Sequence, residues 1–416
     1  MTEEVVIEKL VHGGQGIGTL SDGRRVFVWN VLPGEKVRVR LTKNKHKLAE
    51  GIADEIIEPS SEREQPRDDA YLSTSPWQMM TWASENTYKR DILIETLQRE
   101  HVKVPTDIIM VSGDHQWHYR NKMEYSFWAD DHGLHLALFN RGSHGKQIVP
   151  GSSIAMPVVD ETANKILAVL NNHHIRGSQL KTVIVRANQV GETVAALFAK
   201  DEALIEMPEL ADVCSGVVVY YSNPKSPASV ATRELYVYGT TTLGDKLLGS
   251  DIQYDVNSFF QVNVDVFTKA LDRIKAAVSD MPYVDMYSGV GTIGLAIGGA
   301  AVLVESDHHN IEMARRNATG TGAEVVEATA ETALEYIDSK YCLIVDPPRA
   351  GLHAKVIERI LNAKPPRIVY LSCNPITQAR DLALLQGKYS LTSIEGYNFF
   401  PRTPHIESLA ILDLTE

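Results

Sequence analysis

The side chain best suited to covalent chemistry is Cys373, in the segment Ser372-Cys373-Asn374-Pro375. A lone cysteine is either a nucleophile or a small buried apolar residue. Cys373 ends an apolar stretch instead of filling it, and Asn374-Pro375 forces a turn directly after it. These surroundings favour a nucleophile.

The other two cysteines lack such surroundings. Cys342 begins an apolar stretch and is predicted to be a core residue, whereas Cys214 precedes one with no polar cluster near it. The three cysteines lie far apart and form no C-x-x-C pair, so we expect neither a disulfide framework nor a zinc site of the usual spacing.

A second group of ionisable side chains lies near the C-terminus, in a loop that reads Phe399-Phe-Pro-Arg-Thr-Pro-His-Ile-Glu407. Its two prolines restrict the backbone and so fix the groups beside them. Glu407 is suited to a general base, although a lone glutamate is often only a surface carboxylate. His405 is equally suited to that role, so the residue types alone leave both open.

Two further segments are suited to binding a ligand. Gly289, Gly291 and Gly294 form a G-x-G-x-x-G pattern, which lets backbone approach a ligand closely where a strand turns into a helix. The ligand is a dinucleotide or S-adenosylmethionine, and Glu305 would bond ribose hydroxyls of either; the alternative is a tight turn without a ligand. Asp346, before two prolines, either faces that ligand or caps the next helix.

The elements that position these groups form an α/β unit. From about residue 260, apolar strands at 283–286, 302–305, 343–345 and 368–371 alternate with helical segments, which predicts a doubly wound parallel sheet. Ligands bind beyond the carboxyl ends of such strands, and all four candidate segments follow a strand end. A nicotinamide dehydrogenase needs neither the cysteine nor the Asp-Pro-Pro, so the combination favours S-adenosylmethionine.

The rest of the 416-residue chain predicts two more domains. Residues 1–58 alternate short strands with Gly-rich turns, which fits a small OB-fold-like β-barrel. Residues 59–250 are mainly strands, with helices near 82–103 and 158–173, and predict a central α+β domain; the first of these helices is expected to pack on the catalytic domain, residues 251–416.

Charge and composition narrow the class of protein. The net charge is −12, but residues 36–47 contain six basic side chains and no acidic one. This strip is either an RNA-binding face or merely solvated. No apolar run reaches membrane-spanning length, and the N-terminus is acidic, so we predict a cytoplasmic protein with no membrane association.

Five motifs together resemble the RNA uracil-5-methyltransferases. They are Asn257-Ser-Phe-Phe-Gln-Val-Asn263, Asp285-Met-Tyr-Ser-Gly-Val-Gly-Thr-Ile-Gly-Leu295, Val345-Asp-Pro-Pro-Arg-Ala-Gly-Leu352, Leu371-Ser-Cys-Asn-Pro375 and Phe400-Pro-Arg-Thr-Pro-His-Ile-Glu407. Residues 1–58, with Phe27-Val28 and Leu32-Pro-Gly-Glu35, resemble the TRAM domain of the ribosomal-RNA branch. The likeness covers essentially the whole chain.

The resemblance implies a Rossmann-like S-adenosylmethionine-dependent domain and a role for each motif. Cys373 would be the nucleophile and Glu407 the general base, and Tyr119-Arg-Asn-Lys122 would face RNA. The cofactor would be contacted by Gln261, Tyr287, Gly289, Glu305 and Asp346. The reaction implied is methylation of uridine carbon 5 through a covalent cysteine adduct at carbon 6. The expected partner is ribosomal RNA, 23S above all, with transfer RNA as the alternative, and the expected state is a monomer.

The chain departs from the iron–sulfur branch of that family. Members of that branch carry four cysteines around the region that here reads Pro66 to Gln78, which contains none. Three cysteines in all cannot hold a four-cysteine cluster within one chain, so we expect no iron–sulfur cluster. Two rivals stay open at this point: a nicotinamide oxidoreductase, and an RNA-binding protein without catalytic activity.

Overall fold

The computed structural model describes residues 2–104, 107–143, 145–226, 228–299 and 301–415. Its N-terminal part is a closed five-stranded barrel in the order β1-β2-β3-β5-β4. The strands are β1 (Thr2–Leu10), β2 (Gly16–Thr19), β3 (Arg25–Trp29), β4 (Lys36–Asn44) and β5 (Leu48–Glu58). Alternate apolar side chains point inward and form a small core of their own, which confirms the strand pattern predicted for this segment.

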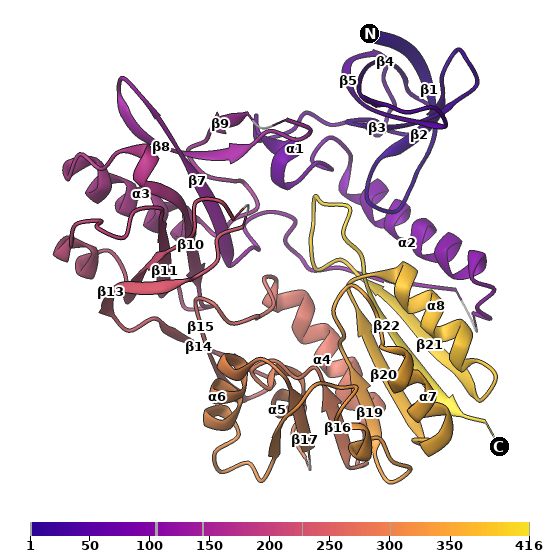
Figure 1. The fold of residues 1–416 in the computed structure, drawn as a ribbon. Helices are drawn as coiled ribbons and strands as arrows, with labels where there is room; N and C mark the ends of the chain where they lie inside the picture. The colour runs from indigo at the N-terminus through magenta and orange to yellow at the C-terminus, as the bar shows by residue number, and fades with distance from the viewer. Residues whose placement is uncertain (1, 105–106, 144, 227, 300, 416) are drawn as a thin grey trace.

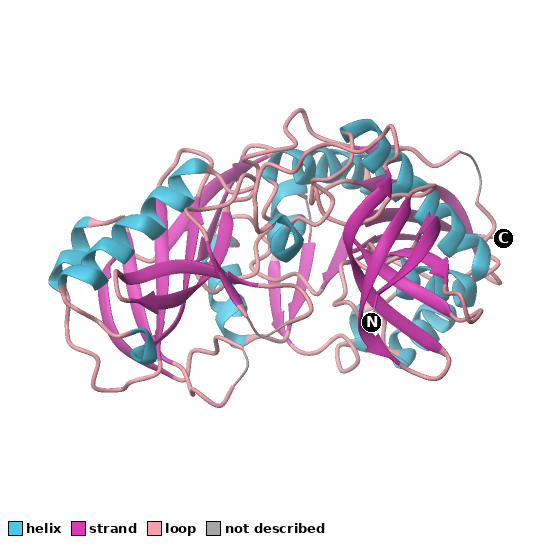
Figure 2. Ribbon diagram, turned by 90° about the horizontal axis from the view of Figure 1, so that it is seen from above, coloured by secondary structure: helices cyan, strands magenta, loops and turns pink. Residues whose placement is uncertain are grey.

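The middle of the chain forms a seven-stranded sheet in the order β13-β12-β11-β10-β7-β8-β9. Helix α3 (Pro157–Asn172) packs on one face of it and shares its core. The strands are β7 (Lys122–Asp130), β8 (Gly133–Phe139), β9 (Lys146–Ile148), β10 (Leu180–Ala187), β11 (Thr193–Ala199), β12 (Gly216–Tyr221) and β13 (Arg233–Gly239). Figures 1 and 2 show this sheet at the end of the molecule away from the barrel.

The C-terminal part is an eight-stranded sheet in the order β18-β17-β16-β19-β20-β22-β21-β6. The strands β16 to β20 are parallel, whereas β22 runs antiparallel between β20 and β21. The strands are β6 (Met110–Val111), β16 (Tyr283–Met286), β17 (Ala301–Glu305), β18 (Glu324–Glu327), β19 (Cys342–Val345), β20 (Arg367–Ser372), β21 (Tyr389–Tyr397) and β22 (Glu407–Leu414). The order reverses at β16, so the topological switch point, where open α/β sheets bind their ligands, lies between the ends of β16 and β19.

Helices cover both faces of this sheet, as the doubly wound prediction requires. They are α4 (Val264–Val278), α5 (Thr292–Ile297), α6 (His308–Asn317), α7 (Ala354–Ala363) and α8 (Pro375–Leu385). Among the described helices none has the length and apolar character needed to cross a membrane.

Several elements connect the central domain and the catalytic domain that were predicted from the sequence. Helix α2 (Trp82–Arg99) packs against α8, and β6 (Met110–Val111) adds to the C-terminal sheet beside β21. The hairpin of β14 (Thr242–Leu247) and β15 (Ser250–Asp255) spans the boundary drawn at 250/251. One apolar core runs from β11 and β12 through this hairpin into the C-terminal sheet, so the two parts are packed together.

The segment from Pro66 to Gln78 is held by side-chain hydrogen bonds. It contains the short helix α1 (Tyr71–Thr74). The Gln78 amide oxygen accepts from the backbone N–H groups of Arg67 and Asp68, at 2.9 and 3.1 Å. Its amide nitrogen donates to Asp68 Oδ2 and to Ser75 Oγ, at 3.0 and 2.7 Å. One buried glutamine thus satisfies four groups of this loop.

Candidate active site

The geometry of the site begins with the pairing of β20 and β22. Ser372 lies opposite Ser408 in this antiparallel pair, so the next residue of one strand and the preceding residue of the other are neighbours at the same edge. These residues are Cys373 and Glu407. Residues 34 positions apart in sequence therefore bring a thiol and a carboxyl together at the carboxyl end of β20.

The surroundings of Cys373 favour the neutral thiol. The residue is half-buried, and burial together with the nearby carboxyls of Glu407 and Asp346 raises its pKa to about 11. Arg349, in the loop after β19, acts in the opposite direction and lowers that pKa by charge and by a hydrogen bond. The thiol therefore needs a proton acceptor or a second positive charge before it can attack a substrate.

We expect alkylation of Cys373 by iodoacetamide to accelerate about tenfold per pH unit between pH 6 and 10. The reason is that the thiolate fraction grows in this way until the pH reaches the pKa of about 11. Peptide mass spectrometry after timed quenching would measure the rate. In Arg349→Met the pKa should be higher, so alkylation at any pH in this range should be slower. A rate that levels off near pH 7 would contradict the raised pKa.

Glu407 begins β22 and is 3% exposed. Burial and the charge of Asp346 raise its pKa well above the usual range, while Arg349 lowers it. Burial alone raises the pKa of Asp346 to about 7. His405 lies 3.4 Å from Arg349 through its Nδ1 atom, and burial and that guanidinium lower its pKa to about 4. The imidazole is therefore neutral at pH 7, and Arg349 lowers the pKa of Cys373, His405 and Glu407 alike.

The glycine pattern forms the turn from β16 into α5. The N–H of Gly289 donates to Glu305 Oε2 at 2.9 Å, and Glu305 also accepts from the backbone N–H groups of Ser306 and Asp307. Gly291 adopts a left-handed conformation with φ of 85°, and a Cβ on Gly294 would lie 2.4 Å from Leu303. Gly289 also has a positive φ, of 57°, so the turn or the close packing of the helix on the sheet favours glycine at all three positions.

Asp285 lies in β16, the strand that leads into this turn. Its Oδ2 accepts the N–H of Gly294 at 2.9 Å, whereas Oδ1 is buried with no partner among the described residues. Burial raises its pKa to about 8, so the carboxyl is largely protonated at pH 7. The motif that carries this residue gave no sign of its protonation state.

A stability measurement tests this carboxyl. Between the pKa of the unfolded chain, about 3.9, and the folded value of about 8, the folded protein binds more protons, so its stability falls as the pH rises. We expect Asp285→Asn, which removes this titration, to reduce the fall in unfolding free energy by up to about 1.4 kcal/mol per pH unit in that range. Urea unfolding from pH 5 to 8 would measure it. Equal slopes for the two proteins would contradict the raised pKa.

Two more of the predicted cofactor residues are Tyr287 and Gln261. Tyr287 follows β16 with a positive φ of 65°, and burial raises its pKa to about 12. Gln261 is buried, and its backbone carbonyl accepts a hydrogen bond from Asn121 Nδ2 at 3.1 Å. Tyr119 is also buried, and its hydroxyl donates to the carbonyl of Pro401. Tyr119 and Asn121, expected to face RNA, therefore hold two loops of the site.

A buried polar cluster that the sequence analysis missed fixes the loop before Glu407. Lys89 and Glu85, both on α2 and both 0% exposed, form an ion pair at 2.9 Å. Lys89 Nζ donates to Asn398 Oδ1 and to the carbonyl of Phe400, at 2.6 and 3.0 Å. Both oxygens of Glu85 accept the backbone N–H of Arg402 at 3.0 Å. We call these four residues together with Phe400 the α2 clamp.

We expect Lys89→Met to destabilise the protein by about 3–5 kcal/mol, because it removes the ammonium group that pairs with the buried carboxylate of Glu85. The double variant Lys89→Met/Glu85→Gln should recover much of this loss, since it removes both charges. Thermal and urea unfolding of the three proteins would measure the effect. If the single variant were as stable as the wild type, the pair would not be a buried charge pair.

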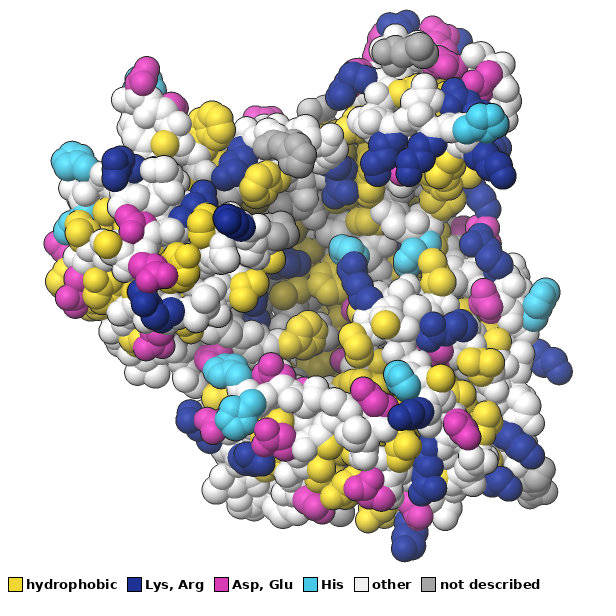
Figure 3. All heavy atoms as spheres, in the orientation of Figure 1, with side chains coloured by type: hydrophobic (Ala, Val, Ile, Leu, Met, Phe, Trp, Pro, Cys, Tyr) yellow, Lys and Arg dark blue, Asp and Glu magenta, His cyan; other side chains and the backbone are white. Residues whose placement is uncertain are grey.

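The face that holds these groups is hollowed. Figure 3 shows a depression between the barrel, the middle sheet and the C-terminal sheet, with hydrophobic side chains in its floor and Lys, Arg and His side chains on its rim. The barrel contributes to this region directly, because Gly14 lies against Pro404 and its carbonyl accepts from Trp77 Nε1 at 3.1 Å. His12 lies close enough to Arg349 for that charge, together with burial, to lower its pKa.

Comparisons with known proteins agree with this arrangement. Residues 303–414 match the family model of tRNA (Uracil-5-)-methyltransferase, and residues 1–53 match that of the TRAM domain. An "Uncharacterized RNA methyltransferase" of Enterococcus faecalis is 27% identical, covering 98% of this chain and 96% of its own. A protein of Thermotoga maritima with the same description is 27% identical, covering 99% of both chains.

Among solved structures, the tRNA (uracil-54, C5)-methyltransferase of Pyrococcus abyssi, crystallised with S-adenosyl-L-homocysteine, has the same fold. Its TM-score is 0.82 at 24% identity, over 98% of this chain and 100% of that one. The predicted α/β fold with an N-terminal barrel is thus confirmed, and the matches agree with the motifs quoted from the sequence. The chain is therefore an RNA methyltransferase that is similar in residues 303–414 to the tRNA (Uracil-5-)-methyltransferase family and carries an N-terminal TRAM domain.

Proposed function

We propose that the protein methylates carbon 5 of a specific uridine in RNA, with Cys373 as covalent nucleophile and Glu407 as general base. The Ser372–Ser408 register carries this proposal, because it sets a thiol and a carboxyl side by side at the ligand-binding edge of the sheet. We assign RNA binding to residues 1–58 and 59–250 and catalysis to residues 251–416, in a cytoplasmic monomer.

The residues around the glycine loop suit S-adenosylmethionine, which supplies an electrophilic methyl group when it is bound. A Cβ on Gly289 would meet no atom within 4 Å, so this backbone is open to a ligand. Ser288 Oγ is buried and unpartnered within the described part of the chain. We propose that this ligand is held by Gln261, Tyr287, Gly289, Glu305 and Asp346.

In the proposed reaction, the thiol of Cys373 loses its proton to solvent, and the resulting thiolate adds to carbon 6 of the uracil. Electron density moves to carbon 5, which becomes nucleophilic enough to accept a methyl group. Glu407 then takes the proton from carbon 5, and the carbon–sulfur bond breaks to release Cys373 as a thiolate. The raised pKa of Glu407 suits this role, since a carboxylate with a higher pKa is a stronger base. The target base must leave its stack to reach this edge.

The RNA substrate has two candidates. We propose 23S ribosomal RNA, because residues 1–58 resemble the TRAM domain of the ribosomal-RNA branch. Transfer RNA is the second candidate, because the enzyme of Pyrococcus abyssi with the same fold acts on transfer RNA.

The decisive experiment incubates the purified protein with methyl-labelled S-adenosylmethionine and either transfer RNA or ribosomal RNA from cells that lack this gene. Nucleoside digestion and mass spectrometry would identify the product. We expect 5-methyluridine at one position of one RNA. Label on a ribose or on a ring nitrogen, or no label in either RNA, would refute the proposal.

A further inference from the structure

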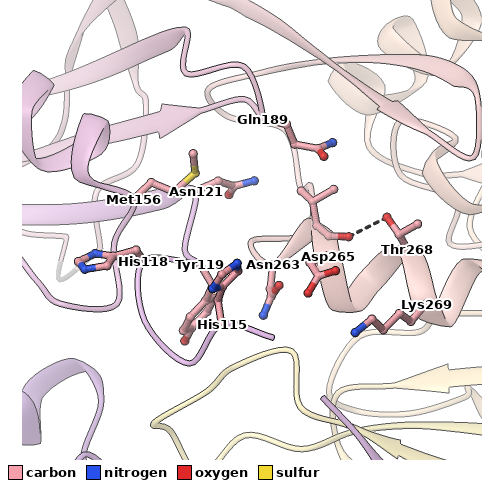
Figure 4. Close-up of a pocket in the computed structure, with 11 residues that line it drawn as sticks. His115, His118, Tyr119, Asn121, Met156, Gln189, Asn263, Asp265, Thr268 and Lys269 are labelled. Carbon is pink, nitrogen blue, oxygen red and sulfur yellow. Dashed lines mark hydrogen bonds between the residues drawn. The ribbon is translucent and has the colours of Figure 1, made fainter. Parts of the chain in front are cut away.

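A cavity of about 780 Å³ lies between the middle sheet and helix α4. Figure 4 shows its walls: the loop before β7, the turn between β10 and β11 at Gln189, and the first turns of α4. Its lining includes none of Cys373, Glu407 or the five residues assigned to the cofactor. Its volume falls in the range of small-molecule sites.

Two buried amides in this wall are each satisfied on one side only. Asn121, 2% exposed, donates from Nδ2 to the carbonyl of Gln261, and its Oδ1 has no partner among the described residues. Asn263, 3% exposed, accepts the N–H of Val266 through Oδ1 as the cap of α4. Its Nδ2 has no partner in the described chain. The partners fix both orientations, so one free acceptor and one free donor are left at the cavity.

A free acceptor and a free donor in one cavity wall are the two kinds of group that pair with the edge of a nucleobase, because each of the four RNA bases presents both donor and acceptor atoms. A buried amide group without a hydrogen-bond partner lowers the stability of the protein. A ligand that forms hydrogen bonds with both amides would therefore stabilise this site. The wall also contains Tyr119, His115 and Met156, whose flat or polarisable side chains suit contact with a base. His118 has its Nδ1 bound to the carbonyl of Ala155, which leaves Nε2 available.

The cavity is linked to the proposed reaction centre on two sides. Asn121 donates a hydrogen bond to the carbonyl of Gln261, and Asn263 lies two residues after Gln261 in the same segment. Tyr119 donates to the carbonyl of Pro401 in the loop that precedes Glu407. A ligand bound here would therefore touch the residues that hold both the cofactor segment and the catalytic loop.

We propose that this cavity binds a second, unpaired nucleobase of the substrate RNA, read by Asn121 Oδ1 and Asn263 Nδ2. This inference rests on the proposed function, since it concerns the RNA of that reaction. A base of the same chemistry also occurs in free nucleotides, which the experiment below separates from RNA. Recognition of one nucleotide besides the target would help the enzyme to select one uridine among many.

The key variant is Asn263→Asp. Its carboxylate still accepts the N–H of Val266, so the cap of α4 is kept, but the free donor is lost. The second variant is Thr268→Phe, which fills the cavity from its partly exposed side without altering either amide. The matched control is Asn172→Asp, the same change at an exposed residue at the end of α3.

The first measurement uses the RNA that the wild type methylates. We expect both variants to raise the KM for RNA about five- to 150-fold with an unchanged affinity for S-adenosylmethionine. In a scan with single abasic nucleotides, the wild type should depend on one position besides the target, and Asn263→Asp should no longer depend on it. Wild-type KM in both variants and an unaltered scan would overturn the proposal.

The second measurement does not need turnover. Saturation-transfer NMR of Cys373→Ala, saturated with S-adenosylhomocysteine, would be recorded with AMP, CMP, GMP and UMP. With at least one of these nucleotides we expect a signal. This signal should disappear in Asn263→Asp and in Thr268→Phe, and it should persist in Asn172→Asp. If the wild type methylates no RNA, the proposed function fails and this measurement alone decides the cavity; no cavity-dependent signal would then refute it. A nucleotide signal combined with an RNA scan that shows no second position would assign the cavity to a free nucleotide and also overturn the proposal.

Discussion

Replacing Cys373 by alanine is expected to lower the rate of RNA methylation by at least about 10⁴-fold while S-adenosylmethionine still binds with nearly wild-type affinity. Carbon 5 of uracil is a poor nucleophile until a thiolate adds at carbon 6. No other thiol can substitute, because Cys342 is buried inside the sheet and Cys214 lies beside β12 in the middle sheet. The loss should therefore appear in kcat and not in cofactor affinity.

Cys214→Ser is the matched control, because Cys214 is also partly buried and its thiol donates to the carbonyl of Gly216 in the middle sheet. We expect this variant to retain wild-type turnover. Calorimetry with S-adenosylmethionine and single-turnover kinetics with labelled RNA would separate binding from chemistry. Retained turnover in Cys373→Ala would exclude the covalent mechanism, whereas loss of cofactor binding would point to a disturbed sheet edge.

RNA that contains 5-fluorouridine extends the same test. Its carbon 5 carries no proton to remove, so the wild type should accumulate a stable protein–RNA adduct, and Cys373→Ala should form none. A band of reduced mobility in a denaturing gel, with the modified peptide located by mass spectrometry, would measure it. An adduct that persists in Cys373→Ala would place the nucleophile elsewhere.

The parallel strands and the segments that follow them were predictable from sequence, because each is a short apolar run directly followed by polar or glycine residues. All four predicted strands are present as β16, β17, β19 and β20. Such runs are local, and their side-chain pattern depends only on burial on both faces. The strand ends carry Tyr287, Glu305, Asp346 and Cys373, so the position of these candidate site residues was predictable from the sequence.

The candidate site residues on β22 and the α2 clamp were not predictable from the sequence, because their positions depend on which distant segments of the chain pair. That Glu407 faces Cys373 requires β22 to insert between β20 and β21, and antiparallel pairing of this kind leaves no local mark in the sequence. The α2 clamp joins residues more than 300 positions apart. Lys89 and Glu85 look like a solvated pair on a helix, although they share one face with Ile92, and that spacing was the available signal.

Replacing Glu407 by glutamine is expected to stop the reaction after methyl transfer, so that native RNA stays covalently bound to Cys373. Glutamine keeps the size of the side chain and cannot accept the carbon-5 proton. Without that step the carbon–sulfur bond cannot break, and turnover should fall by about 10²–10⁴-fold. A denaturing gel with native RNA would show the adduct, and digestion would show a base that carries the methyl group.

Two further proteins make this result specific. The double variant Cys373→Ala/Glu407→Gln should form no adduct, and Glu395→Gln, on the neighbouring strand β21, should retain turnover because that carboxylate pairs with Arg273. Free, unmodified RNA after incubation with Glu407→Gln would contradict a role that begins only after methylation. It would mean that Glu407 is needed for the attack itself, for example to take the proton from Cys373.

His405 is the rival base, and the register of the strands favours Glu407. Its imidazole is neutral at pH 7, with a pKa lowered to about 4, so it is a weak proton acceptor. Glu407 has a raised pKa and begins the strand that pairs with β20, next to the thiol. We therefore expect His405→Gln to retain turnover within about tenfold of wild type, without trapped RNA. An adduct that accumulates in His405→Gln and not in Glu407→Gln would assign the role of general base to His405.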